Sequence, residues 1–263
     1  MKTLSYSKID MFKKCPLEFR HIYVDRDIPK KDSEALRYGS FLHSVIEDIS
    51  NAIKDNGGVI PDNIASLATK SWKRHGKLYK ISGELLKESR SILKQYGQIV
   101  RGTTDAKIIS NEHSFNFTVE GDYHIVGKID QILGKKDKYL VRDYKTNKSS
   151  KYLLRDPLQL KIYSLAVSKE LDISPEQIIT SFMFLRLGCE EKRKKFSTSE
   201  IEETEKFLHD IGEEINNCIS SKEFVAKIGP LCPWCPAIDK CAKAQSQRWI
   251  MEKYNKLVMQ GVV

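Results

Sequence analysis

The chain has 263 residues, of which 40% are hydrophobic and 30% are charged, a composition that excludes a disordered polymer. Lysine and arginine (44) outnumber aspartate and glutamate (35), and the net charge of +9 favours a polyanionic partner, nucleic acid before others. No stretch approaches the about 20 apolar residues of a membrane span, and no signal-peptide block follows Met1, so we expect a soluble, cytoplasmic protein with no membrane partner.

The first third of the chain predicts mainly helices. Ser5 can cap a helix that begins the chain. Apolar residues recur at helical spacing over residues 38–53. Residues 62–100 also have a helical pattern, and we expect interruptions at His75-Gly76 and at Ser82-Gly83.

After residue 103 the apolar period changes from helical spacing to alternation. Phe115, Phe117 and Val119 alternate with polar residues, and a second alternating run covers residues 123–133. A turn at residues 134–137 separates this run from a third one at residues 138–145. These runs predict a β-meander.

A helix and a buried strand are expected next. Asp156-Pro157 is typical of a helix start and predicts a helix over residues 158–171. The apolar residues 178–187 predict a buried strand. The strongly charged segment 189–195 predicts an exposed loop, and its lysines could touch a DNA backbone.

The last part of the chain is predicted to be helical around a cysteine-rich segment. Ser199 and Glu202 have the spacing of a capping box for a helix that ends near Ile219. A segment rich in cysteine and proline occupies residues 229–241, and a final helix is expected over 249–259. No repeat or linker divides the chain, so we expect one domain.

Two carboxylates and a lysine are predicted to meet on the meander. Residues two apart in a strand share a face, so Asp143 and Lys145 project together, and Asp130 on the neighbouring strand could approach them. Carboxylates of this kind hold Mg²⁺ or Mn²⁺ for phosphodiester hydrolysis, while a lysine orients the attacking water. The alternative is that all three are ordinary solvent-facing strand residues.

The cysteines indicate a metal site. Cys232, Cys235 and Cys241 have C-x₂-C-x₅-C spacing, and Cys15, followed by proline, is the natural fourth ligand. Four thiolates suit tetrahedral Zn²⁺, although zinc sites usually pair two C-x₂-C motifs and only one is present here.

The remaining two cysteines, Cys189 and Cys218, lack partners at a useful spacing. We expect both to be small buried apolar residues.

These motifs, taken in order, resemble the PD-(D/E)XK nuclease superfamily, and within it the branch of the RecB and AddB nuclease domains and the iron-sulfur nucleases of CRISPR adaptation. The resemblance covers most of the chain. It rests on Leu4-Ser5-Tyr6-Ser7, Cys15-Pro16, Tyr38-Gly39-Ser40-Phe41-Leu42-His43, Glu112, Gly127-x-x-Asp130, Asp143-Tyr144-Lys145-Thr146, Gln159-x-x-x-Tyr163 and the three carboxyl-terminal cysteines.

The resemblance implies an α/β, restriction-endonuclease-like fold whose central mixed sheet is flanked by helices. Residues 1–103 would form a mainly helical part, 104–190 the catalytic sheet core, and 191–263 a helical part with the cysteine site. The proline of the superfamily name is absent, because Ile129 precedes Asp130.

The resemblance also implies a role for each site residue. His43, Asp130, Asp143 and the Tyr144 carbonyl would bind the divalent metal, and Lys145 would be the catalytic lysine. The catalytic set would also include Glu112, although alternation points its side chain away from Phe115 and Phe117. Gln159 and Tyr163, four apart on one helix face, would line the site and contact DNA.

For the cysteines, the resemblance implies a [4Fe-4S] cluster on Cys15, Cys232, Cys235 and Cys241, with zinc as the alternative. All four thiolates would be ligands, so the cluster would have a structural role, and its loss would weaken DNA binding only indirectly.

The activity implied is a Mg²⁺- or Mn²⁺-dependent DNA exonuclease that acts on single-stranded ends, in repair, recombination, phage replication or CRISPR adaptation. The alternatives are a structure-specific or nicking endonuclease and a catalytically degenerate DNA-binding scaffold with a Cys₄ metal site. No phosphate-binding loop G-x-x-x-x-G-K-[ST] occurs, so unwinding would need a separate helicase or a recombination or adaptation partner.

Overall fold

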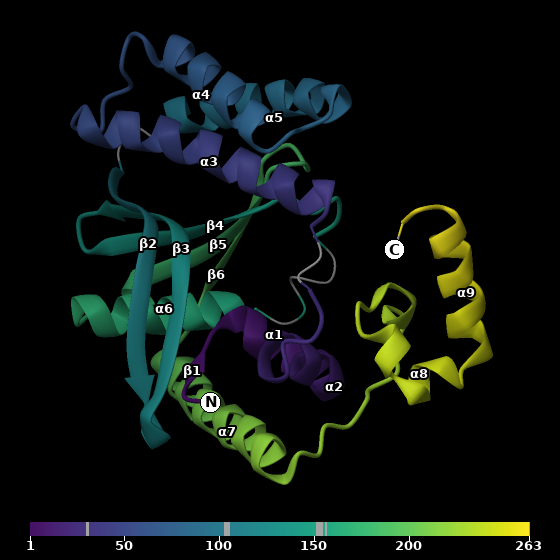
Figure 1. The fold of residues 1–263 in the computed structure, drawn as a ribbon. Coiled ribbons are helices and arrows are strands. Elements are labelled where there is room, and N and C mark those ends of the chain that lie inside the picture. Colours follow the sequence, from purple (N-terminus) through teal and green to yellow (C-terminus); the bar gives the residue numbers. More distant parts are fainter. Residues whose placement is uncertain (30–31, 103–105, 151–154, 156, 263) are drawn as a thin grey trace. The chain divides into compact units, whose positions relative to one another are not determined.

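The computed structural model describes residues 1–29, 32–102, 106–150, 155 and 157–262 (Figure 1). The chain divides into two compact units. The terminal unit comprises Met1–Lys31, Thr118–Ile125 and Phe207–Val263, and the sheet unit comprises Asp32–Phe117 and Val126–Lys206. The single-domain organisation and its three parts stay a prediction.

The sheet unit is built on a mixed sheet, and its meander is confirmed. Its strands are β2 (Lys107–Val119), β3 (Tyr123–Lys135), β4 (Lys138–Lys145), β5 (Ile178–Phe184) and β6 (Glu190–Lys195). β2 pairs with β3, β3 with β4 antiparallel, β4 with β5 parallel, and β5 with β6 antiparallel. The parallel step requires a crossover, which the helix α6 (Leu158–Leu171) supplies. Asp156, expected to cap this helix, lies outside the described residues.

Helices cover both faces of this sheet (Figure 1). Tyr144 of β4 bonds through its hydroxyl to that of Tyr96 on α5 (Gly83–Gly102), at 3.1 Å. Its neighbour Asp143 instead accepts a hydrogen bond from Gln159 of α6, at 2.8 Å. Successive strand residues point to opposite faces, so α5 covers one face and α6 the other.

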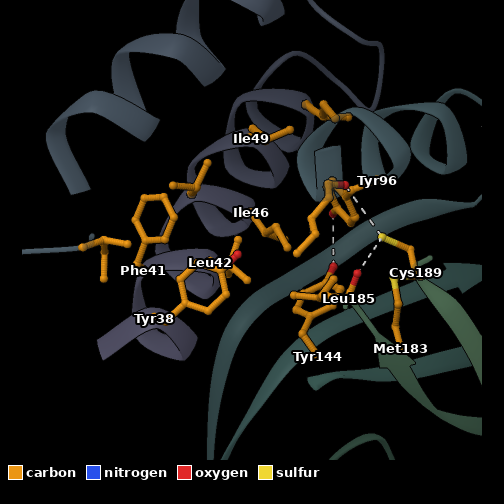
Figure 2. Close-up of a cluster of buried hydrophobic side chains, with 14 residues drawn as sticks. Tyr38, Phe41, Leu42, Ile46, Ile49, Tyr96, Tyr144, Met183, Leu185 and Cys189 are labelled. Atoms are coloured by element: carbon orange, nitrogen blue, oxygen red, sulfur yellow. Dashed lines mark hydrogen bonds between the residues drawn. The ribbon is translucent and has the colours of Figure 1, made fainter. Parts of the chain in front are cut away.

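The apolar stripe of α3 (Glu34–Asp55) packs into the main core beside α5, as its spacing predicts (Figure 2). Ser33 caps this helix by accepting from the Leu36 amide at 3.3 Å. The core cluster joins α3 and α5 to the sheet through Tyr144, Met183 and Leu185.

The expected interruption at His75-Gly76 is wrong, because α4 (Ile64–Leu78) runs through it. Gly76 is buried, and a Cβ there would lie 3.0 Å from a Leu86 methyl carbon, so this glycine allows two helices to approach closely. The chain turns instead at Lys80, whose φ is +52°, and α5 begins at Gly83.

The loop expected over 189–195 is a strand, β6, which pairs with β5 from Phe184–Glu190 to Ile179–Lys195. Gly188 and Cys189 have φ values of +70° and +56° and form the turn between the two strands, which ends β5 before the expected Leu187. Charged side chains suit an edge strand, because they discourage pairing with a further chain.

Glu191 of β6 forms a buried ion pair that supports this edge. Its Oε1 lies 2.7 Å from Nε of Arg142, which is 3% exposed and also donates to Gln131 at 2.8 Å. Removing one partner of a buried pair leaves an uncompensated charge.

We expect Glu191→Leu to lower the free energy of unfolding by about 3 kcal/mol, because Arg142 would stay buried without its carboxylate. Urea-induced unfolding measures this. Glu190→Leu, at an exposed position of the same strand, is the control and should change stability by less than about 0.5 kcal/mol. Equal losses in both variants would contradict the role given to the pair.

The helix α7 (Thr198–Ser221) begins one residue before the expected cap. The capping box is formed by Ser197 and Glu200: the Glu200 amide donates to the Ser197 hydroxyl at 3.2 Å, and the Ser197 amide donates to the Glu200 carboxylate at 3.0 Å. The Ser199–Glu202 prediction is therefore wrong, since the same S-x-x-E spacing occurs two residues earlier.

The terminal unit is mostly helical. Its elements are β1 (Thr3–Leu4), α1 (Tyr6–Lys14), α2 (Pro16–Phe19), the π-helix η1 (Arg20–Val24), the 3-10 helix η2 (Glu120–Asp122), the 3-10 turns η4 (Cys232–Trp234) and η5 (Ile238–Lys240), α8 (Ala242–Gln245) and α9 (Arg248–Met259). A further 3-10 turn, η3 (Pro175–Gln177), belongs to the sheet unit.

β1 pairs in parallel with the start of β3, where Leu4 lies opposite Ile125. Ser5 caps α1 as predicted, accepting from the Lys8 amide at 3.4 Å. Among the described residues, no helix has the length and apolar character to cross a bilayer.

Candidate active site and cysteine site

Asp143 and Lys145 share a face of β4, as the alternation predicts. The Lys145 ammonium lies 2.7 Å from Oδ2 of Asp143 and donates to Gln159 Oε1 at 2.7 Å. It also lies 4.9 Å from the centre of the Phe182 ring, on the adjacent strand β5. The lysine is therefore fixed in position by a carboxylate, an amide and an aromatic face.

Asp143 is 4% exposed, and one of its two carboxylate oxygens accepts two hydrogen bonds. Its Oδ1 accepts from Gln159 Nε2 at 2.8 Å and from the Tyr163 hydroxyl at 3.1 Å. Among the described residues, Oδ2 forms an ion pair with Lys145 and receives no well-oriented hydrogen bond. Burial raises the pKa of Asp143; the Lys145 charge opposes this and the Asp130 charge adds to it.

The antiparallel pairing of β3 and β4 ends with Gln131 opposite Arg142, and Asp130 and Asp143 are the next residues on the two strands. Oδ2 of Asp130 accepts from the Tyr144 amide at 2.6 Å, and its Oδ1 is 3.3 Å from Nδ1 of His43 on α3. The carboxylate is thus held between the end of β4 and the helix.

His43 reaches the same end of β4 from α3. Its Nε2 donates to the Tyr144 carbonyl oxygen at 3.0 Å. A separation of 3.0 Å is that of an ordinary hydrogen bond. An imidazole nitrogen, a carboxylate and a carbonyl oxygen are all groups that bind divalent cations, so His43, Asp130 and the Tyr144 carbonyl fit such a cation in the chemistry of their donor atoms.

Glu112 joins this group, although alternation had pointed it away. One ligand atom each from His43, Glu112 and Asp130 lie within 4.8 Å of one another. Asp143 does not join them at this distance.

The backbone of β2 explains the position of Glu112. Its φ of +48° is left-handed. Asn111 and His113, which should share a face, instead bond to Asn51 of α3 and to Glu170 of α6. The left-handed residue therefore interrupts the alternation, as bulged strands do beside active sites.

Gln159 and Tyr163 lie on one face of α6, as predicted, and both are buried. Gln159 bridges Asp143 and Lys145, and the Tyr163 hydroxyl donates to the Lys128 carbonyl at 2.9 Å and to Asp143. These contacts orient the carboxylate and the lysine. Their contact with DNA stays a prediction.

The sequence reasoning missed Glu47 and Lys128. Together with Gly39, Ser40, His43, Ser44, Tyr79 and Glu112 they line a polar cavity of about 440 Å³ beside the candidate metal group. Glu47 follows His43 by four residues on α3, so helical spacing could have revealed it. Burial raises its pKa, and Glu112 and Asp48 add to the effect. Lys128, in turn, forms an ion pair with Glu112 at 3.2 Å.

The protonation of His43 can be measured in metal-free protein. Burial opposes its charge, but the hydrogen bond to Asp130 and the negative charges of Asp130, Asp143 and Glu112 raise its pKa to about 9. We expect NMR titration of the imidazole to place its midpoint near 9, and Asp130→Asn to lower it by at least one pH unit.

A His43 midpoint that Asp130→Asn leaves unchanged would contradict the pairing. Because a raised pKa stabilises the charged form, the imidazolium contributes to stability below the unfolded value of about 6.5, and this contribution is lost as the pH rises through 9.

The four cysteines proposed as ligands all line one cavity of about 620 Å³ in the terminal unit. Backbone amides donate to two of the sulfurs, from Gly229 to Cys232 at 3.3 Å and from Ala244 to Cys241 at 3.4 Å. Burial raises the pKa of Cys235 to about 12, and Glu18 and the thiols of Cys15 and Cys232 contribute.

The spacing of the sulfurs tests which metal group they fit. Tetrahedral zinc with bonds of about 2.3 Å holds its sulfurs about 3.8 Å apart. No three of these four described sulfurs lie within 4.8 Å of one another. The four sulfurs are therefore not gathered at the separation of tetrahedral zinc ligands among the described residues.

The two other cysteines differ from each other. Cys189 is 2% exposed, as predicted, and belongs to the main core. Cys218 is only partly buried, so the prediction is wrong for this residue, which lies on the less covered part of α7.

Comparisons with known proteins bear on the family and the fold. No curated protein sequence matches the chain. A solved structure named "Putative exonuclease", from Eubacterium rectale, has a TM-score of 0.57 at 11% identity and covers 86% of this chain and 84% of its own. A second, SSO0001, has a TM-score of 0.44 at 15% identity, with coverages of 92% and 87%. The model of the PD-(D/E)XK nuclease superfamily matches residues 3–242, and the chain belongs to this superfamily.

Proposed function

We propose that this protein is a Mg²⁺- or Mn²⁺-dependent DNA exonuclease that acts on single-stranded ends. The observation that carries the proposal is the convergence of His43, Asp130, Glu112 and the Tyr144 carbonyl at the end of β4, beside the Asp143–Lys145 pair. The superfamily is one of nucleases, and its members use divalent metals on DNA.

The metal would be held by His43, Asp130 and the Tyr144 carbonyl, with Glu112 in the same group. Asp143 lies outside that group and would complete the site as a further ligand. A bound divalent cation lowers the pKa of a water molecule and neutralises charge on the scissile phosphate. The ring of His43 must lose a proton before Nε2 can act as a ligand, so its proton competes with the metal.

Lys145 is placed to orient the attacking water and to stabilise the negative charge that develops on the phosphate. Its ammonium is held by Gln159 and Asp143, so it needs little reorganisation during the reaction. Gln159 and Tyr163 also donate to Oδ1 of Asp143, so that Oδ2 is the oxygen that faces Lys145. These buried residues position the reacting groups.

We also propose that Cys15, Cys232, Cys235 and Cys241 hold a structural [4Fe-4S] cluster, as in the RecB- and AddB-like branch. Support comes from the shared cavity and the amide donors to two sulfurs, since such hydrogen bonds are common at iron-sulfur sites. Four thiolates would leave the cluster no open position for substrate, so its role would be to join the terminal helices.

The exonuclease assignment is favoured by the name of the E. rectale structure, whose fold this chain shares. A structure-specific or nicking endonuclease would use the same residues. A degenerate DNA-binding scaffold is disfavoured, because each acidic and basic position of the site is occupied and in contact.

One assay separates these functions. End-labelled single-stranded, double-stranded and circular DNA are incubated with Mg²⁺ or Mn²⁺. We expect labelled single strands to shorten and circles to stay intact. Cleaved circles would support the endonuclease, and binding without cleavage of any substrate would support the scaffold. Shortening of duplex ends only after a helicase is added would point to a separate unwinding partner in repair or recombination.

A further inference from the structure

A groove between α4 and α5 takes no part in the candidate active site. Its floor is apolar and combines Ile49 of α3, Ile64 and Ala68 of α4, and Leu93 and Gly97 of α5. The cavity measures about 560 Å³. Ile64, Ala68 and Leu93 pack on the main core but are only partly buried. The groove therefore leaves part of that core accessible to solvent.

The charged residues that line this groove are all basic. Lys73 of α4 and Arg90, Lys94 and Arg101 of α5 line it, all four are exposed, and no carboxylate lines it. Among the described residues, none of the four forms an ion pair with a carboxylate. These four positive charges are therefore available to a negatively charged partner.

The floor favours a protein over a nucleic acid as that partner. A single DNA strand gains affinity by stacking its bases on aromatic faces. The one aromatic side chain lining the groove, among the residues described, is Trp72, whose ring is covered by the Arg90 guanidinium at 4.5 Å. Its indole nitrogen already donates to Ser89 at 2.8 Å. The floor beneath the basic residues is aliphatic, which suits the apolar face of a helix.

We propose that this groove binds an acidic amphipathic helix of a partner protein. From Arg90 to Arg101 the groove follows α5 for about 16 Å, the length of about three helical turns. Leucine or other aliphatic residues at helical spacing on the partner helix would cover the aliphatic floor. Flanking glutamates or aspartates of that helix would form ion pairs with Lys73, Lys94 and Arg101. This docking surface is additional to the proposed nuclease function and does not depend on it.

Gly97 makes the proposal testable without unfolding the protein. A Cβ at this position would meet no atom within 4 Å, so a larger side chain can enter the groove without displacing a neighbour. Leucine also favours a helix more than glycine does. Gly83 of the same helix has equally open space but lies outside the groove, and Gly83→Leu is therefore the matched control.

The probe is a synthetic fluorescent peptide with leucines at i, i+3, i+4 and i+7 between glutamates, beside a scrambled peptide of the same composition. By fluorescence anisotropy we expect the first peptide to bind the full-length protein and the second not to bind. Gly97→Leu and the double variant Lys94→Glu/Arg101→Glu should each weaken binding at least about tenfold. Gly83→Leu and Lys87→Glu, outside the groove, should stay within about twofold.

Three results would overturn the proposal: no binding, equal binding of the scrambled peptide, or unchanged binding by Gly97→Leu. A single-stranded oligonucleotide is measured in parallel. If the double variant loses affinity for DNA as strongly as for the peptide while Gly97→Leu binds the peptide normally, the groove binds DNA and the proposal is wrong. Because each readout is binding, failure of the nuclease assay leaves this test unaffected.

Discussion

Replacing Lys145 by methionine is expected to lower the rate of DNA cleavage by at least about 10³-fold, with the fold and the metal affinity retained. Methionine keeps most of the length of lysine and can lie against Phe182, whose ring is 4.9 Å from the ammonium. What is lost is the positive charge beside Asp143 and Gln159, at 2.7 Å from each. The lysine charge would stabilise the negative charge that develops on the phosphate. Its removal should therefore lower the rate of the chemical step.

Single-turnover cleavage of a labelled strand at saturating Mn²⁺ measures this rate, and calorimetry measures the Mn²⁺ affinity. Lys138→Met, at the exposed beginning of the same strand, is the control and should cleave at the normal rate. Asp143→Ala should lose activity as well, together with part of the metal affinity. A Lys145→Met protein that cleaves within tenfold of the unsubstituted protein would remove the lysine from the mechanism.

The placement of Asp143 and Lys145 could be predicted because a strand has only two faces. Once residues 138–145 are extended, the period of two puts both side chains on one side, and the short turn to β3 makes Asp130 and Asp143 the next residues after the paired segments. Here a local rule was enough. The environment of these residues could not be predicted, because the burial of Asp143 depends on α6, which follows later in the chain.

Glu112 and β6 show where local rules fail. The left-handed backbone conformation at Glu112 could not be predicted from the sequence, because glutamate rarely adopts it. The charged composition of β6 is typical of a loop, and only the free edge of β5 makes it a strand. Strand formation is decided by the neighbouring strand more than by intrinsic preference.

The cysteine site, too, could be predicted from the sequence only in part. The spacing of Cys232, Cys235 and Cys241 is local, and it predicts that these three can face one centre. Cys15 has no local signal beyond the proline after it. Its place in the same cavity depends on the packing of α1 and α2 within the terminal unit.

Replacing Cys235 by serine is expected to abolish the iron-sulfur cluster and to loosen the carboxyl-terminal helices. Protein purified without oxygen should be brown and contain iron and sulfide matching one [4Fe-4S] cluster per chain, whereas Cys235→Ser should be colourless. Cluster binding is coupled to folding of the segment that holds it, so limited proteolysis should cut Cys235→Ser within residues 222–247 much faster. The small apolar group of Ile238, Cys241, Ala244 and Ile250 is too limited to hold this segment alone.

Cys218→Ser provides the matched control, because Cys218 is partly exposed on α7 and does not line the cysteine cavity. It should keep the colour, the iron and the resistance to protease.

The rate of DNA cleavage by Cys235→Ser at low temperature should fall less than that of Lys145→Met. The reason is that the proposed cluster ligands lie in the terminal unit and the proposed catalytic residues in the sheet unit. A colourless native protein with stoichiometric zinc would replace the cluster by a Cys₄ zinc site. A native protein without metal, as protease-resistant as Cys235→Ser, would show that these cysteines bind no group at all.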